Sequence, residues 1–149
     1  MTGPSTGCAA VWNEKGDESV VSSGKTGMKI LDLNHVAIHS ADVEASRQFY
    51  EEGLGLVPKA RPAFDFPGAW FDLGGGRELH LLGGMDFSVV SHCRGAHFAL
   101  QVASLDEVQA ELEEKGIPVV QGPQTRPDGA RQIFVTDPDG YWVEFCELR

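Results

Sequence analysis

The chain has few cysteines and no long apolar run, and each shortage excludes a class of protein. Its three cysteines, Cys8, Cys93 and Cys146, are odd in number and show no Cys-x-x-Cys spacing. A disulfide framework and a thiolate zinc site are therefore not expected, whereas a reducing, cytoplasmic compartment is. No stretch approaches the roughly 20 apolar residues that cross a bilayer, so we expect no membrane partner.

Basic residues are also scarce. The sequence holds 12 Lys and Arg against 22 Asp and Glu, which gives a net charge of −10. Nucleic acids and anionic membranes attract basic patches, so neither is expected as a partner. An acidic surface is compatible with a cationic ligand, but in most proteins it serves only to keep the protein soluble. The hydrophobic content of 42% over 149 residues is that of a globular protein with a sizeable core.

Residues 1–27 differ in composition from the rest of the chain. They are rich in Gly, Ser and Thr and contain few large apolar residues. They lack the apolar segment of a secretory signal and the arginines of a mitochondrial transit peptide. We interpret them as a flexible N-terminal tail and place a single domain at 28–149.

From residue 28 onwards the apolar pattern repeats once. Each half, at about 28–83 and 95–149, predicts a strand, a helix and three strands. Asp42 is placed to cap the first helix, and Ser104 with Glu107 forms a capping box for the second. The motif D-P-D-G at 137–140 predicts a tight hairpin turn. The predicted strands are 30–39, 56–59, 69–73, 77–82, 96–102, 118–120, 131–136 and 141–148, and the helices are 42–52 and 105–115.

This order predicts an α+β fold of two tandem βαβββ modules, with a curled mixed sheet around a cleft and the helices outside. Alternation along the strands assigns their faces. In the strand at 96–102, Phe98 and Leu100 point towards the helix-covered core, and His97 points the other way. In the first strand, Val36 likewise points towards the core and His35 points the other way. The two histidines therefore lie on the faces that line the predicted cleft.

Four side chains in corresponding strands predict a metal site. His35 and His97 occupy matching positions in the first strand of each half, and His80 and Glu144 lie in the last strands. His80 follows His35 by 45 residues and Glu144 follows His97 by 47. A pseudo-twofold fold would bring all four to one point. Three imidazoles and a carboxylate suit a divalent zinc, nickel, iron or manganese ion. The other two histidines, His39 and His92, are expected to be solvated.

The chain resembles the vicinal oxygen chelate superfamily, which includes glyoxalase I, extradiol dioxygenases, fosfomycin thiol transferases and bleomycin-resistance proteins. The resemblance covers nearly all of the chain beyond its first 32 residues. It lies in the motifs L-N-H-V-A-I at 33–38, S-R-Q-F-Y-E-E-G-L-G-L at 46–56, E-L-H-L-L at 78–82, A-H-F-A-L at 96–100 and D-P-D-G-Y-W-V-E-F at 137–145.

The resemblance implies a divalent metal in the cleft and a small substrate that chelates it through neighbouring oxygens. His35, His97 and Glu144 match ligand positions shared widely in the superfamily. His80 falls where glyoxalase I has a glutamate ligand, so the implied site has three histidines and one glutamate. Members commonly form homodimers, sometimes with ligands contributed across the interface. The sequence leaves open whether this site forms within one chain or between two.

The reaction that the resemblance favours is of glyoxalase type, a lyase or isomerase in which the metal stabilises an enediolate. Glu144 or Glu78 would move the proton. Phe64, Phe66, Trp70 and Trp142 are candidates for the pocket wall. Glu52 stands where glyoxalase I enzymes tend to carry a basic residue for glutathione, and an acid there would repel that ligand.

Three alternatives stay open. A non-haem iron dioxygenase would use His35, His97 and Glu144 as its ligands and His80 as an acid or base. A fosfomycin thiol transferase would need a basic pocket, for which Arg126 and Arg131 are the second-half candidates. A drug-sequestering binder would fit the acidic balance, although such binders typically lack the metal ligands that this chain retains.

Overall fold

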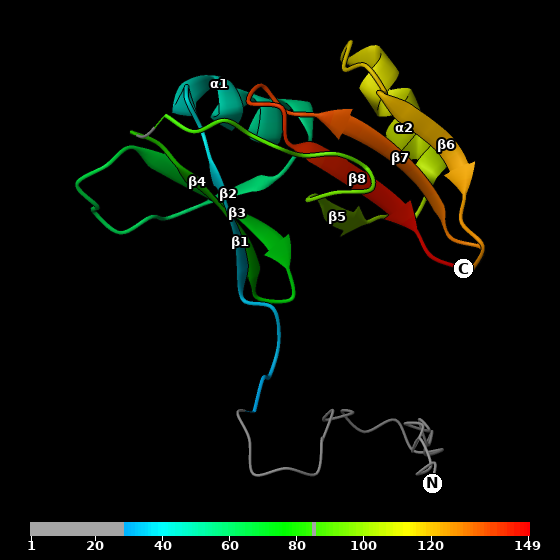
Figure 1. Ribbon diagram of the computed structural model, residues 1–149, viewed down its shortest axis with the longest axis horizontal. Helices are drawn as coiled ribbons and strands as arrows, with labels where there is room; N and C mark the ends of the chain where they lie inside the picture. Colours follow the sequence, from blue (N-terminus) through cyan, green and yellow to red (C-terminus); the bar gives the residue numbers. More distant parts are fainter. Residues whose placement is uncertain (1–28, 85) are drawn as a thin grey trace, which may run out of the picture. The chain divides into compact units, whose positions relative to one another are not determined.

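Two four-stranded sheets form the fold, each accompanied by one helical segment (Figure 1). The structure is a computed structural model that describes residues 29–84 and 86–149, and the fold belongs to Leu33–Arg149. The tail predicted at 1–27 lies outside the described residues. Within the described ranges, no helix has the length and apolar character needed to span a membrane.

The first sheet has the strand order β1-β4-β3-β2, with β1 parallel to β4 and the other pairs antiparallel. Asp42 caps the helix as predicted, because Oδ1 accepts hydrogen bonds from the amides of Glu44 and Ala45. The helix continues from α1 into a short π-helix, η1. The elements are β1 (His35–His39), α1 (Val43–Gln48), η1 (Phe49–Gly53), β2 (Val57–Lys59), β3 (Gly68–Gly74) and β4 (Arg77–Leu82).

The second sheet repeats this topology in the order β5-β8-β7-β6, with β5 parallel to β8. Ser104 caps its helix, since Oγ accepts from the amide of Glu107 at 3.3 Å. The repetition confirms the predicted α+β fold of two βαβββ modules. The elements are β5 (Phe98–Gln101), α2 (Leu105–Glu114), β6 (Gln121–Thr125), β7 (Arg131–Thr136) and β8 (Trp142–Glu147).

Two strand predictions were wrong in position. β1 begins at His35 and not at residue 30, because its pairing with β4 starts at His35↔Glu78 and β4 itself starts at Arg77. The strand expected at 118–120 is β6, which lies at Gln121–Thr125. Its sequence Q-G-P-Q-T shows no apolar alternation because β6 is an edge strand with a register shift, where Gly and Pro are tolerated. His97 directly precedes β5.

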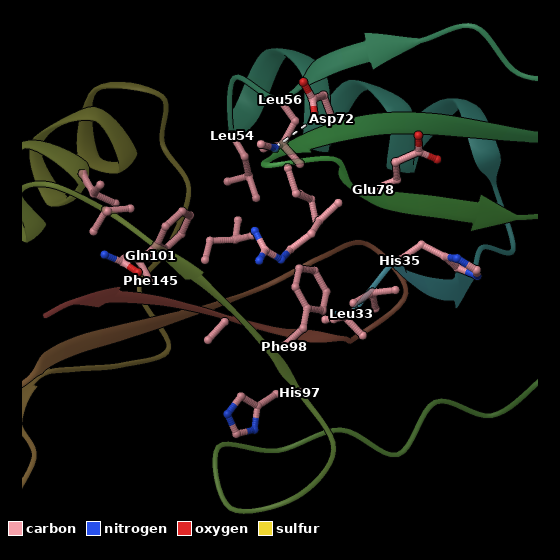
Figure 2. Close-up of a pocket in the computed structure, with 18 residues that line it drawn as sticks. Leu33, His35, Leu54, Leu56, Asp72, Glu78, His97, Phe98, Gln101 and Phe145 are labelled. Carbon is pink, nitrogen blue, oxygen red and sulfur yellow. Dashed lines mark hydrogen bonds between the residues drawn. The ribbon is translucent and has the colours of Figure 1, made fainter. Parts of the chain in front are cut away.

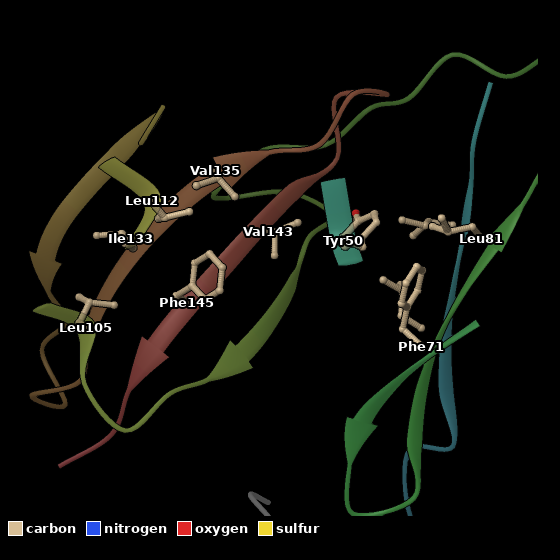
Figure 3. Packing of buried hydrophobic residues seen from close by; sticks show 11 residues of the cluster. Tyr50, Phe71, Leu81, Leu105, Leu112, Ile133, Val135, Val143 and Phe145 are labelled. Carbon is tan, nitrogen blue, oxygen red and sulfur yellow. The ribbon is translucent and has the colours of Figure 1, made fainter. Parts of the chain in front are cut away.

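The helix-covered faces of both sheets contribute to one hydrophobic core (Figure 3). α1 packs on β3 and β4, and α2 packs on β7 and β8. Tyr50 lies between Phe71 of the first half and Val143 of the second, and all three are fully buried. The described strands of one sheet do not pair with those of the other. The faces that carry the predicted site residues therefore point away from the shared core.

The D-P-D-G turn also joins the two halves. Gly140 has a φ of +93°, which a glycine adopts without strain. This conformation confirms the predicted turn. The Oδ1 atom of Asp137 accepts from the amides of Asp139 and Tyr141 at 3.0 and 2.8 Å. Its Oδ2 atom accepts from the hydroxyl of Tyr50 at 2.8 Å. A carboxylate at the turn of the second half thus satisfies the buried hydroxyl of the first.

Candidate functional site

The site face of the first sheet carries a stack of three rings. The parallel pairing of β1 and β4 sets His35 opposite Glu78 and Ala37 opposite His80, so these side chains share one face. The rings of His35 and His80 stack with centroids 4.4 Å apart, and His80 stacks on Trp70 at 4.0 Å. The structure therefore brings His35 and His80, two of the four predicted ligands, into contact.

The side chains of His80 and Lys59 both contact the carboxylate of Glu78. Its Oε2 atom lies 2.7 Å from Nε2 of His80, and its Oε1 atom accepts from Nζ of Lys59 at 2.5 Å. The hydrogen bond with His80, followed by that with Lys59, lowers the pKa of Glu78 below its usual value. A carboxylate with a lowered pKa is a weaker base. The role of Glu78 as a proton carrier stays a prediction, and this environment favours Glu144 over it.

The site face of the second sheet pairs His97 with Glu144, whose Nε2 and Oε2 atoms lie 3.0 Å apart. Nδ1 of His97 lies 3.0 Å from the carbonyl oxygen of Gly95, which can only accept, so Nδ1 carries the proton. In the neutral ring, Nε2 then presents a lone pair to a carboxylate oxygen. Two acceptors at this distance require a cation between or beside them, either a proton or a metal ion.

Glu144 itself has the features of a metal ligand. It is 4% exposed, and its Oε1 atom is buried with no hydrogen-bond partner among the described residues. The guanidinium of Arg126 stays 3.9 Å from this oxygen, beyond hydrogen-bonding distance. Burying a carboxylate oxygen without a partner is costly, so a group that binds it is expected. The donation from Nδ1 of His97 to a backbone carbonyl is also common for metal-binding histidines.

Within one chain the two pairs do not form the single cluster predicted from the sequence. No three His, Cys, Asp or Glu side chains in the described ranges lie close enough to hold a metal ion together. Figure 2 shows His35 and Glu78 on one side of a cavity and His97 on another. The structure brings the candidate ligands together only as two pairs: His35 with His80, and His97 with Glu144.

A cavity of about 910 Å³, which His35, Glu78 and His97 also line, is bounded mainly by apolar side chains from both halves (Figure 2). Leu54, Leu56 and Leu73 come from the first half, and Phe98 and Phe145 from the second. His80 and Glu144 do not line it. This cavity can accept an apolar group, but it does not hold the full set of candidate ligands.

Of the remaining sequence candidates, His39 corrects an expectation. It is only 9% exposed, because its ring packs edge-on against Phe87 at 5.1 Å, so it is buried and not solvated. His92 is exposed as predicted, and its ring rests on Trp142 at 4.8 Å. Arg131 does not face the site, since it pairs with Asp106 and Glu147 on the side of α2.

The candidates for the pocket wall lie on both site faces. Trp70 stacks on His80, and Phe64 approaches Trp70 at 6.0 Å and Phe66 at 5.2 Å. Phe64 is 46% exposed. Trp142 packs on Phe134, which in turn contacts the ring of His97 at 5.6 Å. Aromatic side chains thus accompany each pair of candidate ligands.

Sequence reasoning missed a second pocket, which is polar, lies near Glu144 and is lined by Arg94, Arg126 and several glutamines. Arg126 was visible only as one of two arginine candidates for a basic pocket, and Arg94 lies in the loop before β5. No sequence motif links them, because the pocket combines this loop with the β6–β7 hairpin.

Comparison with known proteins agrees with this architecture. Residues 32–145 match the family model of the Glyoxalase/Bleomycin resistance protein/Dioxygenase superfamily. Glyoxylase I 4 of Arabidopsis thaliana is 32% identical over 127 residues, which cover 80% of this chain and 72% of that protein. Metallothiol transferase FosB of Lysinibacillus sphaericus is 26% identical over 124 residues, covering 79% and 83% respectively.

Among solved structures, a protein assigned to the glyoxalase family from Bacillus anthracis superposes with a TM-score of 0.72 and 30% identity, covering 83% of this chain and 100% of that one. The paired modules, the matched segment and these relatives lead to the same result. The chain belongs to the glyoxalase/bleomycin resistance protein/dioxygenase superfamily.

Proposed function

We propose that this protein is a metal-dependent enzyme of glyoxalase type, a lyase or isomerase acting on a small substrate with neighbouring oxygens. The observation that carries the proposal is the pairing of His97 and Glu144. Their facing atoms lie 3.0 Å apart, and Oε1 of Glu144 accepts no hydrogen bond, with only the guanidinium of Arg126 at 3.9 Å; together these features support a bound cation. The similarity to Glyoxylase I 4 supports this reaction class.

The metal site would form between two copies of the chain. One protomer would supply His35 and His80, and its partner His97 and Glu144, because one chain presents these pairs on separate faces. β1 and β5, which carry or adjoin the histidines, are edge strands of their sheets. Edge strands have unpaired backbone groups available to a second copy. The proposed state is thus a homodimer with an isologous interface and two equivalent sites.

A bound zinc, nickel, iron or manganese ion would supply Lewis acidity to the substrate's oxygens. The chain's own groups would position that substrate and move its proton. Glu144 is the proposed proton carrier: one oxygen faces His97, and the other has no hydrogen-bond partner and can accept a proton. The aromatic rings beside each pair of candidate ligands would exclude water from the reacting atoms.

A thiol transferase acting on a phosphonate is the second candidate. The similarity to metallothiol transferase FosB favours it, as does the arginine-containing pocket beside Glu144. Either enzyme would work in the cytoplasm, and the free thiols of Cys93 and Cys146 agree with that location.

The test combines metal analysis with mixed protomers. We would determine the metal content of the wild-type protein, of a His35→Ala/His80→Ala double variant and of a His97→Ala/Glu144→Gln double variant. Each variant alone should lack metal. A refolded equimolar mixture should recover about a quarter of the wild-type content, because half of the dimers are mixed and each holds one complete site of two.

Two outcomes would contradict the proposal at different points. A wild-type protein that holds no divalent metal after incubation with zinc, nickel, iron and manganese would overturn the metal-dependent function. A metal-loaded wild-type protein with no recovery in the mixture would overturn only the shared site. Turnover of an α-oxo aldehyde, with or without a thiol, then indicates the lyase or isomerase, whereas consumption of a thiol only when a phosphonate substrate is present indicates the thiol transferase.

A further inference from the structure

The imidazole ring of His80 is covered on both of its faces. Trp70 stacks on it with ring centroids 4.0 Å apart and planes 6° apart, and His35 stacks on it at 4.4 Å and 14°. The two neighbours lie on opposite sides, because β4 stands between β3 and β1 in the sheet. His80 is accordingly only 9% exposed. The two stacks fix the plane of its ring.

Glu78 fixes the rotation of the same ring within that plane. Its Oε2 atom lies 2.7 Å from Nε2 of His80, and its Oε1 atom pairs with Nζ of Lys59 at 2.5 Å. The ammonium group favours the ionised carboxylate. An ionised carboxylate only accepts hydrogen bonds, so Nε2 of His80 donates. His80 is therefore held by contacts on its two faces and on one edge.

The exposed ring of His35 has its own defined tautomer. Its Nδ1 atom lies 2.8 Å from Oδ1 of Asn34, which can only accept, so Nδ1 carries the proton. Nε2 then carries the lone pair. The ring of His97 is in the same state, since its Nδ1 atom donates to the carbonyl oxygen of Gly95. His35 and His97 thus both offer Nε2 as a ligand atom.

The parallel stack of His35 and His80 cannot place both rings on one metal ion. An imidazole binds a metal through a lone pair that lies in the plane of its ring, and these two planes differ by only 14°. Stacked rings stay at least about 3.5 Å apart, the distance of van der Waals contact. A zinc–nitrogen bond measures about 2.0–2.1 Å. An ion bound in the plane of one ring is therefore too far from the plane of the other.

We propose that His80 is a positioning residue and not a metal ligand, and that it fixes the ring of His35, which binds the ion through Nε2. The inference rests on the proposed function and divides its first pair of histidines by role. It departs from the set of four ligands expected from the sequence. One more coordination position is then open to the neighbouring oxygens of the substrate. The ligands that remain are His35, His97 and Glu144.

Substitutions that separate stacking from ligation test this role in the full-length protein. Each sample is stripped of metal with a chelator and titrated with zinc chloride. His80→Phe keeps a flat ring beside His35 but has no nitrogen. Its zinc affinity should fall by less than about tenfold, the lower limit for a lost outer-sphere partner. Its cobalt(II) ligand-field spectrum should match that of the wild type, because the ligand set is unchanged.

Two further variants give the contrast. His80→Ala removes the support of His35, so zinc affinity should fall by about 10–100-fold. His35→Phe is the matched control, since it keeps a flat ring in the stack and removes the proposed ligand. Its loss of zinc affinity should exceed that of His80→Ala. His80→Gln, whose amide can still donate to Glu78, should retain zinc and provides a second test if His80→Phe does not fold.

A spectroscopic readout on the metal-free protein separates positioning from a general effect on folding. Ring-nitrogen NMR shifts of isotope-labelled protein report which nitrogen of His35 carries the proton. Wild type and His80→Phe should show the Nδ1–H form. His80→Ala, although folded, should show both tautomers in exchange, because the ring of His35 is then free to turn.

Two results would overturn the inference alone. If His80→Phe and His80→Gln lose zinc as completely as His35→Phe, His80 is itself a ligand. If His80→Ala binds zinc as tightly as the wild type, His35 needs no support from its neighbour. Failure of the proposed function looks different, because the wild-type protein itself would then bind no divalent metal, and the inference would be rejected with it.

Discussion

Nε2 of His97 and Oε2 of Glu144 lie 3.0 Å apart, while Nδ1 of the same ring faces a carbonyl oxygen at 3.0 Å. One ring nitrogen therefore donates to the backbone, and the other faces a carboxylate oxygen across a gap that a proton or a metal ion fills. This arrangement holds the imidazole in the tautomer that a metal ion requires. It also makes the carboxylate costly to keep buried when no cation is bound.

The first prediction follows from this cost. The loss of an outer-sphere partner typically lowers metal affinity by about 10–100-fold. Because Glu144 is a proposed ligand, Glu144→Gln should lower it by more than that. In the metal-free protein, the same change should raise the free energy of unfolding by about 1 kcal/mol, because it removes a buried charge with an unsatisfied oxygen. Urea unfolding with and without a chelator measures both changes, the loss of metal-dependent stability and the gain in stability of the metal-free protein. His92→Ala, at an exposed histidine, is the control, and a metal-free variant less stable than wild type would contradict the prediction.

The second prediction concerns the hydrogen bond between Tyr50 and Asp137. Tyr50→Phe removes the buried hydroxyl and leaves Oδ2 of Asp137 without this donor. The free energy of unfolding should fall by about 1–3 kcal/mol. Tyr141→Phe is the matched control, since its hydroxyl only accepts from the amide of His39 at 3.1 Å. Equal losses in the two variants, measured by urea unfolding, would show that the buried carboxylate has no special role.

The third prediction is a pH dependence at Asp137. Burial raises the pKa of this carboxyl above its ordinary value of 3.8, despite its hydrogen bond from Tyr50. The folded protein therefore binds the proton more tightly than the unfolded chain. The resulting stability is fully present below pH 3.8 and is lost as pH rises through the folded-state pKa. Relative to Asp137→Asn, the wild-type free energy of unfolding should fall as pH rises from acid towards neutral. A relative increase would refute the assignment.

The fourth prediction tests the electrostatics of Glu78. Because His80 and then Lys59 lower the pKa of Glu78, Lys59→Met should raise it towards the ordinary value of 4.5. A carboxyl-carbon NMR titration of Glu78 measures this shift directly. Lys115→Met, at a lysine that contacts the carbonyl of Gly53, is the control and should leave the titration unchanged. If Lys59→Met has no effect, His80 alone determines the state of the carboxylate.

The fold could be predicted largely from local patterns. Asp42 and Ser104 begin the helices where their capping side chains indicated, and the D-P-D-G turn adopts the expected positive φ at Gly140. Apolar alternation located β3, β4, β7 and β8. It failed for β6, because an edge strand is largely exposed and needs no apolar side chains. His39 was misjudged because its burial depends on Phe87, in a loop distant in sequence.

The sequence by itself determined the family, the repeated βαβββ order and which strand faces carry His35, His80, His97 and Glu144, because alternation and capping are local properties of the chain. Only the tertiary structure decided which of these residues meet. Strand pairing joined His35 to His80 and His97 to Glu144, and a shared core on the helix-covered faces kept the two pairs apart. It also placed Arg126 beside Glu144 and Arg131 beside Asp106, on opposite faces. Such contacts depend on how distant strands pack, and no spacing along the chain encodes them.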